Sequence, residues 1–181
     1  VRTMSKKPNV CVTGTPGCGK TCTAQRVAET CGYKHLDVSS LVKEHNWHEG
    51  FDDEFQTFTL DEDKVVDGLE EQLSAGGCVV DFHSCGIFPE RWFELVVVLR
   101  TTNDVLYPRL EKRGYPPNKI QENIEAEIMQ VVLDEARESY KEDVVVELQS
   151  NTIDDMDDNV AKIQQWLQSK GVQTGGAMQT A

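Results

Sequence analysis

Three closely spaced glycines near the start of the chain constrain its fold more than any other feature. They lie in the segment Gly14-Thr15-Pro16-Gly17-Cys18-Gly19-Lys20-Thr21, which matches the pattern G-x-x-x-x-G-K-[ST] at every fixed position. A short apolar run rich in β-branched residues precedes the segment at 9–13, and a helical pattern follows it at 23–30. A strand that enters such a loop and leaves it as a helix is typical of α/β domains that hold a phosphate at a helix N-terminus.

The residue types in this loop suit the binding of a nucleoside triphosphate. Glycines adopt backbone angles closed to other residues, so that successive N–H groups turn inward around an anion. Lys20 brings a positive charge to the β and γ phosphates, and the Thr21 hydroxyl is placed to bind a Mg²⁺ ion that those phosphates hold. The alternative, a simple tight turn between strand and helix, does not require the Lys-Thr pair. We expect the ATP site to include Gly17, Cys18, Gly19, Lys20, Thr21 and Cys22.

Strand and helix patterns alternate along the rest of the chain, which predicts an α/β domain of three layers with a five-stranded parallel sheet. The expected strands are 9–13, 34–38, 78–82, 93–99 and 144–148, and the expected helices are 23–30, 39–45, 61–75, 103–113, 119–140 and 156–168. Residues 46–59 show no clear period and are expected to form a loop. Pro108 predicts a kink or a late start in its helix. We expect one domain over 8–170 and a disordered tail over 171–181, which is rich in Gly, Gln and Thr.

The charge of the chain limits its partners. A net charge of −13 over 181 residues argues against direct binding to nucleic acid, whose backbone repels an acidic surface. No apolar run approaches the roughly 20 residues that a membrane-spanning helix needs. Acidic side chains cluster over 49–71 and 134–158. They fit either a solvated surface or a docking face for a Lys/Arg-rich tail.

The six cysteines do not form a zinc-like C-x-x-C pair, and we expect free thiols. Cys18 lies in the phosphate-binding loop and Cys22 directly after it, where a helix N-terminus lowers the pKa of a thiol. These cysteines allow two interpretations: a redox switch at Cys18, or small residues that fill small spaces. The second is favoured.

Two further residues stand at the edge of the sheet where ligands bind in parallel α/β folds. Asp81 ends the third expected strand, where its carboxylate can hold Mg²⁺ through a water molecule or cap a turn. His83 follows two residues later, and a neutral imidazole at this place can orient a water molecule or a nucleophile beside the γ-phosphate.

Several ordered segments together resemble the adenylate kinase 6 family, the nuclear adenylate kinases and ATPases tied to small ribosomal subunit assembly. The match runs from about residue 8 to residue 166. Beside the phosphate-binding loop it includes 60–67, Asp81-Phe82-His83, Phe88-Pro89-Glu90-Arg91-Trp92-Phe93, Arg109-Leu110-Glu111-Lys112-Arg113-Gly114-Tyr115 and 122–128.

The resemblance implies a short nucleoside monophosphate kinase that converts ATP and AMP to two ADP with Mg²⁺ and also hydrolyses ATP. It implies a monophosphate-binding region at 37–60 and a lid at 112–122, with Lys20, His83 and Arg113 in catalysis. Arg113, beside flexible Gly114, would swing over the phosphates, although a cation near a helix C-terminus also interacts with the helix dipole. The implied partner is a small-subunit ribosomal protein with a basic tail, and the implied location is the nucleus and cytoplasm. We expect mostly a monomer.

The acceptor side departs from the family pattern. Lys43 stands where an arginine is expected to hold the AMP phosphate, and an ammonium group lacks the bidentate fork of a guanidinium. Arg91 is the other candidate, unless it serves as an ion-pair residue. An ATP-switched assembly factor with hydrolysis as its main activity is therefore the competing interpretation. A small-metabolite kinase, such as a shikimate or gluconate kinase, would leave the segments around His83 and Arg113 unexplained.

Overall fold

The computed structural model describes residues 5–54 and 56–175, and a parallel sheet of five strands runs through its centre. The order of the strands across the sheet is β2-β5-β1-β6-β7, which confirms the predicted five-stranded α/β fold. The strands are β1 (Val10–Thr13), β2 (Lys34–Asp37), β5 (Cys78–Asp81), β6 (Leu95–Arg100) and β7 (Val145–Gln149). The chain reverses its direction of winding beside β1, so the loop after β1 lies at the topological switch point of the sheet.

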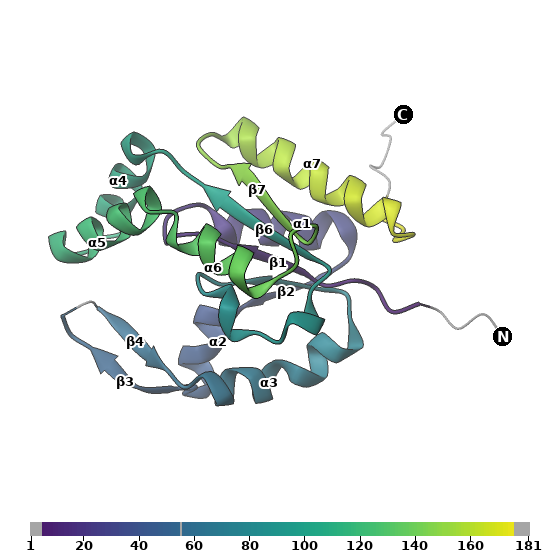
Figure 1. Ribbon diagram of the computed structural model, residues 1–181, viewed down its shortest axis with the longest axis horizontal. Helices are drawn as coiled ribbons and strands as arrows, with labels where there is room; N and C mark the ends of the chain where they lie inside the picture. The colour runs from purple at the N-terminus through teal and green to yellow at the C-terminus, as the bar shows by residue number, and fades with distance from the viewer. Residues whose placement is uncertain (1–4, 55, 176–181) are drawn as a thin grey trace.

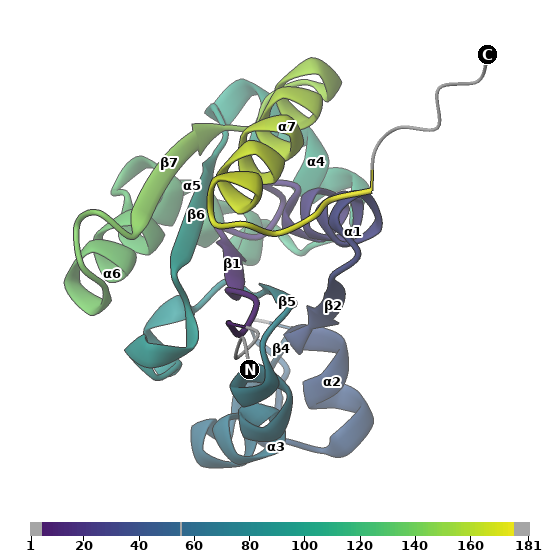
Figure 2. The ribbon, with the colours of Figure 1, turned by 90° about the vertical axis from the view of Figure 1, so that its right-hand side faces the viewer.

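Helices cover both faces of the sheet, as expected (Figure 1). In the view of Figure 2, α1 and α7 lie on one face and α3 and α6 lie on the other. The helices are α1 (Lys20–Cys31), α2 (Val38–His45), α3 (Glu62–Ala75), α4 (Asn103–Lys112), α5 (Pro117–Ile128), α6 (Val131–Ser139) and α7 (Ile153–Ser169). None of those in the described part of the chain is long and apolar enough to cross a membrane.

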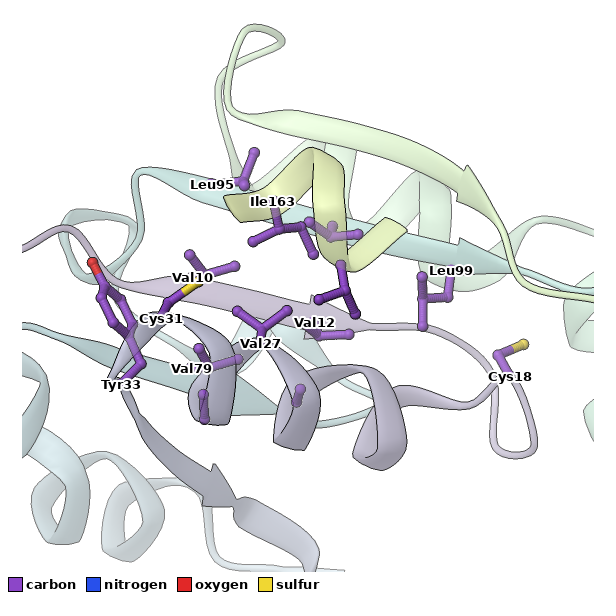
Figure 3. Packing of buried hydrophobic residues seen from close by; sticks show 14 of the residues in the cluster. Val10, Val12, Cys18, Val27, Cys31, Tyr33, Val79, Leu95, Leu99 and Ile163 are labelled. Carbon is purple, nitrogen blue, oxygen red and sulfur yellow. The ribbon is translucent and has the colours of Figure 1, made fainter. Parts of the chain in front are cut away.

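Alternate residues of each central strand enter the two cores. Val10 and Val12 of β1 pack with Val27 of α1 and Ile163 of α7, whereas Cys11 faces the opposite core with Leu69 of α3. Figure 3 shows the first of these cores, which extends to Cys18 in the loop after β1. The central strands are buried on both faces, and this is why they form continuous apolar runs in the sequence.

The prediction of a loop over 46–59 was wrong. The strands β3 (His48–Asp52) and β4 (Thr57–Leu60) form an antiparallel hairpin there, apart from the main sheet. Half-buried and exposed positions alternate along both strands. In β3 the half-buried positions hold His48, Gly50 and Asp52, whereas Phe51 is 47% exposed, so the residue types do not reveal this alternation.

The single helix predicted over 119–140 was also wrong. Gln130 has a φ of 58° in the left-handed region and separates α5 from α6. The apolar pattern runs across this break, and Ile128 and Val131 beside it are 56% and 52% exposed. Helix α4 begins at Asn103 and continues through Pro108, so the proline does not delay its start.

The end of the chain is packed as far as the structure describes it. Val172 is buried, and the Thr174 hydroxyl accepts hydrogen bonds from Gln164 and Gln168 of α7. The rest of the predicted disordered tail, 176–181, lies outside the described residues.

Candidate active site

The candidate site lies at the edge of the sheet where the parallel strands end. The loop 14–19 follows β1, Asp37 ends β2, Asp81 ends β5 and Arg100 ends β6. A cavity of about 820 Å³ opens at this edge, and its lining comes from the loop, α2, the hairpin, α5 and α6. One cavity therefore includes residues predicted for the donor and for the acceptor of a phosphoryl group.

The conformation of the phosphate-binding loop requires glycine at position 17. Gly17 has a φ of +94°, and a Cβ atom there would lie 2.8 Å from Leu106 Cδ1 and 3.1 Å from Leu110 Cδ2. Helix α4 thus packs directly against the loop. Arg109 of the same helix donates hydrogen bonds to the carbonyl oxygens of Gly17 and Ser150, both at 3.1 Å.

Lys20 begins α1 and points back into the loop. Its Nζ donates to the carbonyl oxygen of Thr15 at 3.3 Å, and the Cys18 N–H donates to the same oxygen at 3.1 Å. Burial lowers the pKa of the Lys20 ammonium, and the Arg113 guanidinium lowers it further, whereas the neighbouring Asp81 raises it. A triphosphate would supply the negative charge that this cluster of cations favours.

Thr21 and Asp81, the two residues predicted to hold a metal ion, lie side by side in the lining of the cavity. The Thr21 hydroxyl donates to Asp81 Oδ1 at 3.3 Å. The other carboxylate oxygen, Oδ2, lies 2.7 Å from His35 Nε2. Sequence reasoning missed His35, since nothing in its local pattern reveals that β2 and β5 are neighbours. Asp81 is 3% exposed, and its two partners fix the direction of its carboxylate.

His83 lines the same cavity beside the Phe82 ring, with the ring centroids 4.4 Å apart. Burial lowers the pKa of His83 from 6.5 to about 4, and the charges of Lys20 and Lys119 act in the same direction. The imidazole is therefore neutral at physiological pH, in the form expected for the role predicted above.

Three of the four cations predicted for phosphate contacts, Lys20, Lys43 and Arg113, line the cavity. Lys43 of α2 and Arg113 at the end of α4 belong to its wall, and Lys119 joins them from α5. Arg91 has a different environment: its Nη2 lies 2.7 Å from Glu70 Oε1, its side chain is 62% exposed, and it does not belong to the cavity wall. This placement matches the ion-pair interpretation and gives no support to AMP binding by Arg91.

The cysteines are free among the described residues, and Cys18 is fully buried. Burial raises the pKa of its thiol, and the nearby Glu127 carboxylate raises it further. Burial and Glu127 thus act against the effect of the helix N-terminus, and the buried side chain matches the favoured interpretation of a small residue that fills a small space. Cys22 is exposed in the first turn of α1.

The chain is similar to several known proteins. A family profile described as an AAA domain matches residues 10–130. An adenylate kinase isoenzyme 6 homolog of Dictyostelium discoideum is 54% identical over 163 residues, with 90% of this chain and 93% of that protein covered. The homolog of Schizosaccharomyces pombe is 51% identical over 160 residues, with coverages of 88% and 91%. A shikimate kinase structure from Bacteroides thetaiotaomicron superposes with a TM-score of 0.61 at 16% identity, over 89% of this chain and 98% of that one.

The sheet order and the loop between β1 and α1 define a P-loop kinase of the α/β class. The likeness to shikimate kinase extends to the fold alone. Sequence identity near one half over about nine-tenths of the chain is more specific, and the chain belongs to the family of adenylate kinase isoenzyme 6 homologs, which are P-loop nucleotide kinases.

Proposed function

We propose that the protein transfers the γ-phosphoryl group of ATP to AMP, yielding two ADP, and that it also hydrolyses ATP. One observation carries the proposal: the cavity that begins at Lys20 in the phosphate-binding loop extends to Lys43 in α2. Four cations line it, Lys20, Lys43, Arg113 and Lys119, alongside the carboxylates of Asp37, Asp81, Glu122 and Glu135, in a chain whose net charge is −13. Cations gathered at one place in an acidic protein suit two phosphorylated ligands. The names of the homologous kinases agree with adenine nucleotides as substrates.

Different residues bind the triphosphate and the acceptor in this proposal. Lys20 binds the transferring phosphoryl group, and Arg113 approaches it from the end of α4, where Gly114 with a φ of +75° provides a hinge. Lys43 binds the phosphate of the acceptor. His83, neutral in the cavity, accepts a hydrogen bond from a water molecule or orients the acceptor phosphate. Closure of the segment around Arg113 excludes water, which favours transfer over hydrolysis.

Thr21 and Asp81 suit a Mg²⁺ ion shared with the nucleotide. Their facing oxygens are hard ligands 3.3 Å apart, and they provide only part of an octahedral shell. Thr21 would bind the ion directly and Asp81 through a water molecule, and His35 would hold the Asp81 carboxylate in place. When bound with the nucleotide, Mg²⁺ would supply positive charge that offsets the negative charge on the phosphates.

The proposal is tested by following the γ-phosphoryl group. With γ-labelled ATP and AMP, CMP, UMP, GMP or dAMP in turn, we expect label in the diphosphate product with AMP and label in inorganic phosphate with no acceptor. Lys20→Ala should abolish both products, whereas Lys162→Ala, an exposed change on α7, should leave both unchanged. If no monophosphate receives label, the kinase function is refuted and hydrolysis is the activity.

A second candidate is an ATP-switched assembly factor that binds a small-subunit ribosomal protein. It is favoured by the exposed carboxylates of α3, which gather on one helix: Glu62, Asp63, Asp67 and Glu71. A Lys/Arg-rich tail would be attracted to them, and its affinity would fall as salt rises. The nucleus and cytoplasm are the proposed locations for this role.

Titration with a Lys/Arg-rich peptide tests this candidate. Binding should weaken with salt and should weaken further when the four α3 carboxylates become amides. The same change at four exposed carboxylates of other helices, Asp104, Glu125, Asp154 and Asp158, is the matched control. Equal binding by both sets of variants would refute a docking face on α3.

A further inference from the structure

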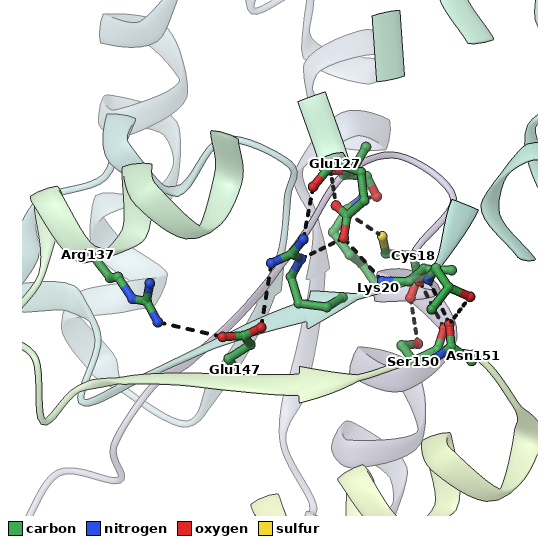
Figure 4. A network of polar contacts seen from close by, with 11 residues as sticks. Cys18, Lys20, Glu127, Arg137, Glu147, Ser150 and Asn151 are labelled. Atoms are coloured by element: carbon green, nitrogen blue, oxygen red, sulfur yellow. Dashed lines mark hydrogen bonds and ion pairs between the residues drawn. The ribbon is translucent and has the colours of Figure 1, made fainter. Parts of the chain in front are cut away.

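Glu127 is a buried carboxylate that has no part in the proposed reaction described above. It contacts the phosphate-binding loop but does not line the cavity. Glu127 lies in the last turn of α5 and is 4% exposed. Its Oε2 accepts a hydrogen bond from Thr15 Oγ1 at 2.6 Å. Its Oε1 accepts from Arg100 Nε at 2.6 Å and from the Thr101 N–H at 3.2 Å (Figure 4). Every one of these partners lies far from Glu127 in the sequence, so the contacts join α5 to the sheet edge and to the loop.

Thr15 links this carboxylate to Lys20. The Thr15 hydroxyl donates to Glu127, while the Thr15 carbonyl oxygen accepts from Lys20 Nζ and from the Cys18 N–H. Rotation of the Thr15 side chain and backbone would therefore move the oxygen that holds the ammonium group. A hydrogen bond to an ionised carboxylate is stronger than a neutral one, so the contact with Glu127 restrains this rotation.

The two helices around Arg113 are both fastened to the same loop. Arg109 fastens α4 through the Gly17 carbonyl at 3.1 Å, and Glu127 fastens α5 through the Thr15 hydroxyl at 2.6 Å. The segment between these two anchors contains Arg113, and it contains Gly114 as the flexible point. A displacement of either helix thus acts on the loop that is expected to hold the triphosphate.

We propose that Glu127 is a positioning residue for phosphoryl transfer: through Thr15 it sets the place of Lys20, and it ties the segment that carries Arg113 to the phosphate-binding loop. The inference rests on the proposed reaction for its kinetic readout. It goes further in assigning a role to a residue that touches neither the cavity nor the expected ligands.

Variants at Thr15 test the link without disturbing the pair between Glu127 and Arg100. Thr15→Val keeps the shape and removes the hydroxyl, and we expect kcat to fall by about tenfold to a hundredfold, with KM for ATP changed by less than about threefold. Thr15→Ser keeps the hydroxyl and should restore kcat to within about threefold of the wild type. Glu127→Gln should resemble Thr15→Val, whereas Glu125→Gln, on the exposed face of the same helix, should behave as the wild type.

A second measurement reports on the loop without any turnover. Cys18 is fully buried and contacts Glu127 through its thiol, whereas Cys31 is buried at the far end of α1. Alkylation of the nucleotide-free protein, resolved by site with mass spectrometry, should accelerate at Cys18 at least about tenfold in Thr15→Val while Cys31 changes little. The ratio of the two rates separates local release of the loop from general unfolding.

Different results would refute or support the positioning role of Glu127. A Thr15→Val protein with wild-type kcat, or with Cys18 and Cys31 accelerated equally, would overturn the positioning role, even if Glu127→Gln fails to fold. If the wild type transfers no phosphoryl group to AMP, the proposed reaction is refuted, and the Cys18 to Cys31 ratio then decides on Glu127 by itself. A selective rise at Cys18 together with the loss of kcat would support the proposal.

Discussion

Replacement of His83 by glutamine should make the stability of the protein less sensitive to acid. Burial, together with the charges of Lys20 and Lys119, lowers the pKa of His83 from 6.5 to about 4 in the folded protein. The unfolded chain keeps the ordinary value. Between these two values the unfolded state binds a proton that the folded state does not, so stability falls as pH falls through this window.

The size of the effect follows from the two values. The full difference between 6.5 and about 4 corresponds to about 3 kcal/mol, reached when both states are protonated. At about pH 5 the unfolded chain is almost fully protonated at this residue while the folded one is mostly neutral. On account of His83 alone, the wild type should then be about 2 kcal/mol less stable than at about pH 7.5.

Urea denaturation of the nucleotide-free and metal-free protein at both pH values measures this quantity. The loss of free energy of unfolding from about pH 7.5 to about pH 5 should be smaller by about 2 kcal/mol in His83→Gln than in the wild type. Lost packing around the ring affects both pH values alike, and it cancels in this double difference. Equal losses in the two proteins would refute the low pKa of His83 and the desolvation that causes it.

Two further substitutions test the acceptor side, and a third tests the packing between α3 and Trp47. Lys43→Ala should raise KM for AMP by about tenfold or more, because a charge-assisted contact with the phosphate is lost; an unchanged KM in steady-state assays would exclude that contact. Arg91→Ala should leave KM for AMP within about twofold, since Arg91 pairs with Glu70, whereas a large rise would restore the role expected from the sequence. Gly68→Ala should destabilise the protein by about 1 to 3 kcal/mol in urea, because the new Cβ would lie 2.1 Å from Trp47 Cζ2; a gain of stability would show that helix propensity prevails.

The donor site could be predicted because its parts lie close together in the sequence. The glycines, Lys20 and Thr21 occupy one strand, loop and helix, and local backbone geometry places them. Asp81 and His83 could be predicted because a strand rich in buried valine ends just before them, and parallel strands end at one edge.

Residues that act through distant contacts could not be found in this way. His35 meets Asp81 because β2 and β5 are neighbours, and Glu127 meets Thr15 across 112 positions of sequence. The break between α5 and α6 at Gln130 was missed for a related reason. Neither glycine nor proline marks it, and the apolar pattern continues through it.

The part of the cavity proposed for the acceptor differs from the part proposed for the triphosphate in how its walls are joined. Backbone atoms accept the hydrogen bonds that join these walls, and this is why residue types predict its structure poorly. The hairpin and α5 extend from the same side of the sheet (Figure 1), and two hydrogen bonds connect them. Asn118 Nδ2 donates to the carbonyl oxygen of Glu54 at 2.7 Å, and Lys119 Nζ donates to that of Gln56 at 2.8 Å. Both acceptors are backbone atoms, which every residue at positions 54 and 56 would offer. The wall proposed for the acceptor therefore depends in part on the path of the hairpin backbone, whereas Lys20 and Thr21 on the proposed donor side come from one local motif.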